Sequence, residues 1–250
     1  MAKTTKKTMT NIHFILQGKG GVGKSFVACH LAQFLIAKNK NLLSIDIDPV
    51  NSTFHKFPDL KVMRIDVLRN DEIDSRKFDL LIENSLNGHD DVIIDSGSSS
   101  FVALASYLIT NDVAAVFHDM GHKVTIHTVI TGGEALLDTV SGFGTMLRQF
   151  PESVAFVVWL NPYHGTIEQD GKPFSEMKIY QDNKARIAGI VTIPEKKAET
   201  FGKDIETMLK AKLTYEQAQS SPLFNVMAKQ RLKMYQRELF AAIDAGTAGV

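Results

Sequence analysis

The stretch QGKGGVGKS, residues 17–25, constrains the fold more strongly than any other part of the sequence. It matches the phosphate-loop pattern G-x-x-x-x-G-K-[ST], and it stands between an apolar run and a helix-forming segment, as that loop requires. Glycines let successive backbone N–H groups face a phosphate, and the start of the following helix adds partial positive charge. The pattern therefore predicts a nucleoside phosphate site, in which Lys24 reaches the outer phosphates and the Ser25 hydroxyl binds Mg2+.

Short apolar runs alternate with helical patterns along most of the chain. The runs are continuous, which is typical of strands that are buried on both faces. Strands that alternate with helices predict an α/β fold, with a doubly wound, mostly parallel sheet and helices on both faces. The predicted strands cover residues 12–16, 42–47, 92–94, 113–117, 154–160 and 187–193, and the predicted helices cover residues 25–37, 98–109, 133–149 and 197–210.

Two segments depart from this alternation. Residues 53–86 are charged and predict only a short strand near residues 62–65 and a helix near residues 76–83. Residues 162–182 carry turn residues and predict a surface excursion that leads into a helix. Because no repeat or interdomain linker is visible, we expect one domain over residues 1–250, with a flexible N-terminus at residues 1–10 and a C-terminal amphipathic helical region at residues 215–246.

Composition limits the partners and the compartment. The 28 Lys and Arg residues balance the 28 Asp and Glu residues, so no global field attracts nucleic acid or an anionic membrane. The only cysteine, Cys29, cannot form an intrachain disulfide or a multi-cysteine metal site, and we expect it to be a small buried residue. No segment resembles a signal peptide or approaches the roughly 18 apolar residues of a membrane span. These features predict a cytoplasmic protein.

Carboxylates follow two of the predicted strands. Asp46 and Asp48 end the run LLSIDID, and Asp95 ends the run DVIID. In a doubly wound sheet the carboxyl ends of the strands form the edge where phosphates bind. Asp95 is therefore expected to hold Mg2+ through water. For each aspartate taken alone, a turn-capping role is the alternative.

The loop variant KGGVGKS, the stretch IDIDP and the later run that ends in Asp95-Ser-Gly resemble the deviant Walker A ATPases of the ParA, MinD and Soj type. The resemblance covers residues 12–194, and it implies a P-loop NTPase fold of the SIMIBI class with ATP or ADP and Mg2+ as cofactors. In that family the first lysine of the loop reaches the nucleotide of a second subunit, so that two chains enclose two ATP molecules. Lys19 matches that position.

The resemblance also implies a set of site residues. Lys19, Lys24 and Asp48 would be catalytic, with Asp48 orienting the attacking water. Ser25, Asp46 and Asp95 would support the metal. The nucleotide would contact Gly18, Gly20, Gly21, Val22, Gly23, Lys24, Ser25 and Phe26, with Asn161 at the adenine edge and Pro194 beside the base.

Two of these assignments stay open. Asn161 has the alternative of a simple turn residue before Pro162. The second switch of the family reads D-x-P or D-T-P-A-G, whereas this chain has Asp95 followed by Ser-Gly-Ser-Ser. The geometry of that switch and the rate of hydrolysis therefore do not follow from the resemblance.

Longer segments are similar to the TraL-type conjugal transfer proteins of broad-host-range plasmids. They are LQGKGGVGKSF, IDIDPVNSTF, DDVIIDSGSSSF, TGGEALLDTVSGF and VVWLNPY. This resemblance implies a setting on the cytoplasmic side of a type IV secretion or conjugation system, with a protein of that machinery as partner. Together with the resemblance to the deviant Walker A ATPases, it implies a slowly hydrolysing, ATP-gated homodimer. One alternative is a nucleotide-stabilised scaffold or plasmid partition protein without significant ATPase activity. Another is a small-molecule kinase or ligase related to dethiobiotin synthetase, for which no substrate motif is present.

The C-terminal region carries an apolar stripe with three cations beside it, Lys229, Lys233 and Arg237. Such a helix can lie on an anionic membrane, which would place the protein at the periphery of the inner membrane. The favoured interpretation is that the stripe packs on the domain or on a partner. The stripe consists of Phe224, Ala228, Leu232, Tyr235, Leu239 and Ile243.

Two further functions are considered and not favoured. The chain has no arginine cluster and no net positive charge, which argues against direct DNA binding. If the protein did bind DNA, its affinity would fall steeply with salt concentration. A metal site at His118, His122 and His127 would need a helix that Gly121 interrupts. We expect these three to be ordinary loop and helix histidines.

Overall fold

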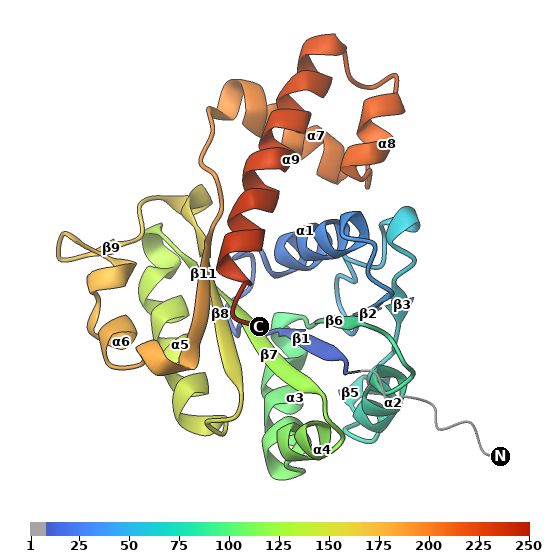
Figure 1. Cartoon of the computed structure of the whole chain (residues 1–250), viewed down its shortest axis with the longest axis vertical. Coiled ribbons are helices and arrows are strands. Elements are labelled where there is room, and N and C mark those ends of the chain that lie inside the picture. The colour runs from blue at the N-terminus through green and yellow to red at the C-terminus, as the bar shows by residue number, and fades with distance from the viewer. Residues whose placement is uncertain (1–8) are drawn as a thin grey trace.

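The computed structural model describes residues 9–250 and places a seven-stranded parallel sheet at the centre (Figure 1). Residues 1–8, which hold most of the predicted flexible N-terminus, lie outside the described residues. The strand order is β11-β8-β7-β1-β6-β2-β3. The strands are β1 (Asn11–Ile15), β2 (Leu42–Asp46), β3 (Met63–Arg64), β6 (Asp91–Asp95), β7 (Lys123–Thr131), β8 (Ala155–Asn161) and β11 (Ile187–Thr192).

Helices cover both faces of this sheet, which confirms the predicted α/β class. Successive strand residues enter different cores: Phe14 and Ile94 pack on one face, whereas Ile15 and Ile93 pack on the other. The first face is covered by α2 (Lys77–Ser85), α3 (Ser98–Thr110), α4 (Val113–Asp119) and α5 (Leu136–Gln149). The second face is covered by α1 (Lys24–Ala37), α7 (Lys203–Lys210), α8 (Tyr215–Ser220) and α9 (Val226–Gly246).

Short elements fill the connections. The predicted excursion at residues 162–182 is built from a turn, a hairpin and the short helix α6 (Lys178–Gln181). The hairpins pair β4 (Leu68–Arg69) with β5 (Glu72–Ile73), and β9 (Glu168–Gln169) with β10 (Lys172–Pro173). Short helical turns occupy Pro58–Leu60, Gly133–Ala135, Pro162–His164, Phe174–Glu176, Lys184–Arg186 and Ala198–Gly202.

One predicted strand is wrong, and the strands β4, β5, β7, β9 and β10 were missed, of which only β7 belongs to the central sheet. Residues 113–117 were predicted to form a strand, but they belong to helix α4. Val113 and Phe117, one helical turn apart, face the core, while Val116 between them is exposed. The strand β7 lies at the middle of the sheet. Its buried threonines and His127 interrupt the continuous apolar run by which the other strands of the sheet were predicted.

The C-terminal stripe packs on the domain. All six of its residues are buried in the core of the second face, together with α1 and β11. The end of α9 presses closely on β11, because a Cβ atom built on Gly189 would lie 2.0 Å from the carbonyl oxygen of Gly246. The stripe is therefore not presented to a membrane surface, which corrects that alternative.

No single helix between residues 9 and 250 is long and apolar enough to span a membrane. The helices α3 and α4 meet the requirements of length and composition only as a pair bent by 55°. Both helices contribute buried residues to the core on the first face of the sheet.

Candidate functional site

The phosphate loop connects β1 to α1, as predicted, and the first turn of α3 crosses it. Gly21 and Gly23 adopt φ angles of 75° and 107°, a region that L side chains rarely enter. A Cβ atom built on Gly18 would lie 3.2 Å from the ring of Phe101, and α3 therefore packs directly on the loop backbone. The loop needs glycine both for its curvature and for this contact.

Lys24 is buried at the start of α1, and its ammonium group donates a hydrogen bond to the carbonyl oxygen of Lys19, at 2.9 Å. Burial lowers the pKa of Lys24, while the charges of Asp95 and Asp48 raise it. The charged lysine is thus stabilised by the two carboxylates that the sequence analysis assigned to the same site. An anionic phosphate in the loop would stabilise it in the same way.

Asp46 and Asp95 end neighbouring strands and are register partners across β2 and β6. The Asp46 carboxylate accepts hydrogen bonds from two backbone N–H groups, those of Asp48 at 2.9 Å and His55 at 2.8 Å. Burial raises the pKa of Asp46, and these hydrogen bonds lower it. Asp46 therefore organises the turn after β2 with both of its oxygens engaged.

Asp95 is fully buried, and neither of its carboxylate oxygens completes a hydrogen bond of normal geometry within the described residues. Burial raises the pKa of Asp95 to about 8, with the Ser25 hydroxyl lowering it and the charge of Asp46 raising it further. A buried carboxylate with free oxygens is costly unless a cation or donor satisfies it.

These residues fit a Mg2+ ion that takes most of its ligands from outside the protein. Within residues 9–250 no group of three or more His, Cys, Asp or Glu side chains is placed to hold a metal on its own. The Ser25 hydroxyl and the unsatisfied Asp95 carboxylate would be the protein's contribution. Mg2+ commonly keeps several waters and binds substrate phosphates, so this small donor set is sufficient.

Asp48 lies in a tight turn against the second switch segment. Its Oδ1 accepts hydrogen bonds from the N–H groups of Val50 at 2.9 Å and Asn51 at 3.1 Å. A Cβ atom built on Gly97 would lie only 2.4 Å from that same oxygen. Only glycine at position 97 leaves room for Asp48, so the turn that holds Asp48 and the segment that follows Asp95 are in direct contact.

The side chain of Lys19 contacts the start of α5. Its Nζ atom lies 2.7 Å from Oδ2 of Asp138, and both side chains are about half exposed. The hydrogen bond and the charge of Asp138 raise the pKa of Lys19. Asp138 was not among the predicted site residues, although an acidic residue in the first turn of a helix after a glycine loop is a usable signal.

Asn161 joins β8 to the phosphate loop. Its Nδ2 donates to the carbonyl oxygen of Val22 at 2.9 Å, and its Oδ1 accepts from the N–H of Tyr163 at 3.2 Å. Both ends of the side chain thus bind the backbone in this structure, and a role at the adenine edge would require them to release it. Two further predicted nucleotide contacts lie close in sequence to these elements. Pro194 follows β11, which pairs with β8. Phe26, in α1, packs its ring on His30, with ring centroids 3.9 Å apart.

Gln17 is a second residue that the sequence analysis missed. It is buried, and its amide donates to the carbonyl oxygens of Val129 at 3.1 Å and Thr139 at 3.2 Å. Its Oε1 accepts a long hydrogen bond from the N–H of Lys19, at 3.4 Å. Gln17 therefore ties the start of the phosphate loop to β7 and α5.

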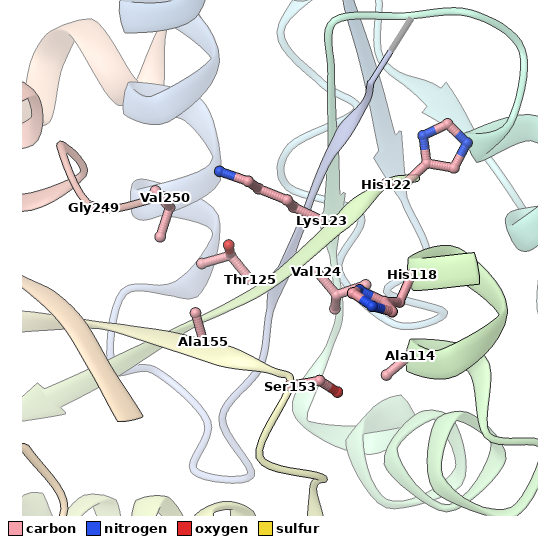
Figure 2. A pocket seen from close by; sticks show the side chains of 10 residues that line it. All are labelled: Ala114, His118, His122, Lys123, Val124, Thr125, Ser153, Ala155, Gly249 and Val250. Atoms are coloured by element: carbon pink, nitrogen blue, oxygen red, sulfur yellow. The ribbon is translucent and has the colours of Figure 1, made fainter. Parts of the chain in front are cut away.

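A hollow of about 250 Å3 lies elsewhere, beside the amino ends of β7 and β8 (Figure 2). Lys123 points to one side of β7, while His118 lies on the other side near Val124. His127 does not line this hollow, because it is buried inside the sheet in β7. The polar groups that line the hollow do not converge on one point. We therefore place the candidate site at the phosphate loop.

Comparisons with known proteins identify the family of the domain. Residues 13–230 match the model of the CobQ/CobB/MinD/ParA nucleotide binding domain. A relative described as "Protein TraL" from Escherichia coli is 52% identical over 237 residues, which cover 95% of this chain and 98% of that protein.

Two solved structures share the fold. The cell division ATPase MinD of Pyrococcus furiosus superposes with a TM-score of 0.52 at 18% identity, covering 94% of this chain and 99% of its own. The septum site-determining protein MinD of Pyrococcus horikoshii, complexed with Mg-ADP, gives a TM-score of 0.50 at 18% identity, covering 95% and 99%.

Proposed function

This chain belongs to the CobQ/CobB/MinD/ParA family of nucleotide-binding domains and groups with the TraL proteins, and on that premise we propose that it is a Mg-ATP-dependent dimerisation switch. The observation that carries the proposal is the buried Asp95 carboxylate, which lies beside Lys24 and Ser25 with its oxygens unsatisfied. Such a group is explained if a cation and a nucleotide complete the site.

Nucleotide binding is assigned to the loop and its lysine. The backbone N–H groups of residues 20–25 would surround the phosphates, and Lys24 would exchange its hydrogen bond to the Lys19 carbonyl for a phosphate oxygen. When bound, Mg2+ supplies charge neutralisation at the outer phosphates. Ser25 and Asp95 would hold the ion, with Asp46 maintaining the turn that brings Asp48 close to them.

Hydrolysis is assigned to Asp48. Phosphoryl transfer needs little covalent chemistry, so the orientation of the attacking water accounts for much of the protein's contribution. Asp48 is nearly buried, and its charge is close enough to raise the pKa of Lys24. Because its carboxylate is held by the Val50 and Asn51 N–H groups and abuts Gly97, we expect slow hydrolysis that responds to movement of either segment.

Dimerisation is assigned to Lys19. Its side chain is half exposed and lies at the rim of the loop instead of inside its own site. Transfer of Lys19 from Asp138 to the phosphates of a second chain would link ATP to assembly. Ordering of segments by a terminal phosphate is a known route for such switches.

The setting that we propose is plasmid conjugal transfer, on the cytoplasmic side of a type IV secretion or conjugation system. It is supported by the high identity to the TraL proteins over nearly the whole chain. The partner would be a protein of that machinery, recognised in one nucleotide state. Direct DNA binding is not favoured, because the net charge of the chain is zero.

The proposal is tested by light scattering of the protein with ADP, with ATP, and of an Asp48→Ala variant with ATP. We expect monomers with ADP, a transient dimer with ATP and a trapped dimer for the variant. An Asp48→Ala variant that remains monomeric with ATP while binding it would contradict the switch.

A nucleotide-stabilised scaffold or partition protein without significant ATPase activity is the second candidate. It is favoured by the unusual second switch, in which Gly97 replaces the proline of the family pattern. Phosphate release separates the two candidates, measured for the protein alone and with DNA, lipid or candidate proteins. Release only with a partner supports the switch, and no release under any condition supports the scaffold.

A further inference from the structure

The segment that departs most from the family pattern, Ser-Gly-Ser-Ser-Ser at residues 96–100, lies against the phosphate loop. Ser96 donates its hydroxyl to the carbonyl oxygen of Ile15 at 2.9 Å, and Ser100 donates to that of Gly97 at 3.2 Å. These two buried serines fix the backbone where β6 turns into α3. They have structural partners and are not available to a ligand.

Ser98 and Ser99 differ from their neighbours. Both are exposed, and neither hydroxyl makes a hydrogen bond in the part of the chain that the structure covers. Ser98 alone faces the loop: a Cβ atom built on Gly20 would lie 3.4 Å from its Oγ. Ser98 therefore has an unused hydroxyl directly over the loop backbone.

The surroundings of Ser98 suit an anion. The helix cap Gly97 provides no side-chain hydrogen bond, and the first turn of α3 contains no acidic residue. The N–H groups of that turn thus keep their partial positive charge. Gly20 also follows Lys19, whose carbonyl oxygen receives the Lys24 ammonium group, so Ser98 lies beside the place where the outer phosphates are expected.

The same corner holds the fully buried Asp95 carboxylate, whose two oxygens make no hydrogen bond of normal geometry within residues 9–250, although the Ser25 hydroxyl is close to it. Asp95 is a second sign that a ligand completes this region, because its ionised form needs a cation, which a nucleotide would bring. Asp48 also reaches it, through its contact with Gly97. A terminal phosphate bound here would therefore contact the phosphate loop, the metal held near Asp95 and the first turn of α3.

We propose that Ser98 is a phosphate-contacting residue that donates its hydroxyl to the terminal phosphate of ATP and so distinguishes ATP from ADP. This inference rests on the proposed nucleotide-binding function. Because a hydrogen bond to a charged group is stronger than a neutral one, its loss is expected to weaken ATP binding by roughly tenfold.

The test measures binding of a fluorescent, non-hydrolysable ATP analogue and of fluorescent ADP, both with Mg2+, to four proteins. They are the wild type, Ser98→Ala, Ser98→Thr and the matched control Ser99→Ala. We expect Ser98→Ala to lose about tenfold in affinity for the ATP analogue and to bind ADP normally. Ser98→Thr keeps the hydroxyl and should retain most of the affinity, and Ser99→Ala should match the wild type.

Each outcome has a defined meaning. If Ser98→Ala binds the ATP analogue as tightly as Ser99→Ala, or loses ATP and ADP affinity equally, the role of Ser98 is wrong while the proposed function stands. If the wild type binds neither nucleotide, the proposed function itself fails and this inference falls with it. Thermal unfolding of all four proteins checks the fold, which an exposed serine should not disturb.

Discussion

The ammonium group of Lys19 lies 2.7 Å from the Asp138 carboxylate, so the extra lysine of the phosphate loop is held by α5 within its own chain. Both side chains are half exposed, and pairs of this kind exchange readily with solvent and other partners. The contact leaves Lys24 as the only loop lysine in its own chain's site. It also keeps Lys19 at the surface, where a second chain can reach it.

The first prediction concerns Lys19→Ala. We expect this variant to bind ATP and ADP within about threefold of the wild type, because Lys24 holds the phosphates. It should lose ATP-dependent dimerisation and hydrolysis. Nucleotide titration, light scattering and phosphate release measure the three properties.

The matched control is Asp138→Asn, which breaks the same ion pair but keeps the lysine. It should still dimerise with ATP. If both variants lose dimerisation alike, the ion pair with α5 matters and the proposed reach of Lys19 to a second chain is wrong.

The sequence predicted the phosphate loop, the α/β class and most strands, since continuous apolar runs and a glycine pattern are local signals. It failed at β7, where buried His127 and threonines are stabilised by neighbours distant in sequence. Thr131, for example, donates its hydroxyl to the carbonyl oxygen of Asn161. Asp138 and Gln17 were missed for the same reason. Asp138 pairs with Lys19, 119 residues away, and Gln17 donates to the carbonyl oxygen of Thr139, 122 residues away.

The site was predicted in part. The placement of Asp46, Asp48 and Asp95 at strand ends follows from the rule for parallel sheets, and the structure brings them together. What the rule could not supply is which oxygens are free. Asp46 uses both of its oxygens on backbone N–H groups, whereas the Asp95 oxygens remain unsatisfied, and that difference arises only in the folded chain.

A second prediction follows from the burial of Asp95, whose pKa is raised to about 8 from an ordinary value of 3.8. Between these two values the unfolded chain is ionised at this position and the folded chain is protonated. The nucleotide-free protein should therefore lose stability as pH rises from about 4 through about 8. Asp95→Asn should flatten this profile and raise the melting temperature at pH 8 by several degrees.

Thermal unfolding from pH 5 to pH 9 measures this difference. In the presence of Mg-ATP the order should reverse, because Asp95→Asn loses the carboxylate that supports the metal. Parallel pH profiles for the two proteins would show that Asp95 does not titrate in this range.

A third prediction concerns Gly97→Ala. The added Cβ would lie 2.4 Å from the Asp48 carboxylate, so Asp48 or α3 must move. We expect a loss of about 1–3 kcal/mol in the free energy of unfolding, and phosphate release should fall to background. The control is Gly202→Ala, where the nearest atom to the new Cβ lies 3.6 Å away and the backbone is helical. Normal activity in Gly97→Ala would refute the coupling between Gly97 and Asp48.

The last prediction uses a buried chain of hydrogen bonds across four strands. The Trp159 indole N–H lies 3.0 Å from Nδ1 of His127, whose Nε2 lies 3.0 Å from Nδ1 of His13. Since an indole can only donate, His127 must accept at Nδ1 and carry its proton on Nε2. His13 then accepts at Nδ1 and donates from Nε2 to Asp91, at 3.1 Å. The direction of the whole chain is thus set by the single tryptophan.

Trp159→Phe removes the donor and leaves a buried nitrogen of His127 unsatisfied, which should cost about 1–3 kcal/mol in the free energy of unfolding. Burial and the charge of His13 hold the pKa of His127 well below its ordinary 6.5. Below pH 6.5, His127 therefore binds a proton in the unfolded chain but not in the folded chain. The free energy of unfolding should fall on acidification. Urea unfolding by circular dichroism at pH 7.5 and 5.5 measures both effects. Trp159→Phe should keep the acid sensitivity, while His127→Leu should reduce it; an unchanged pH dependence in His127→Leu would remove His127 as its source.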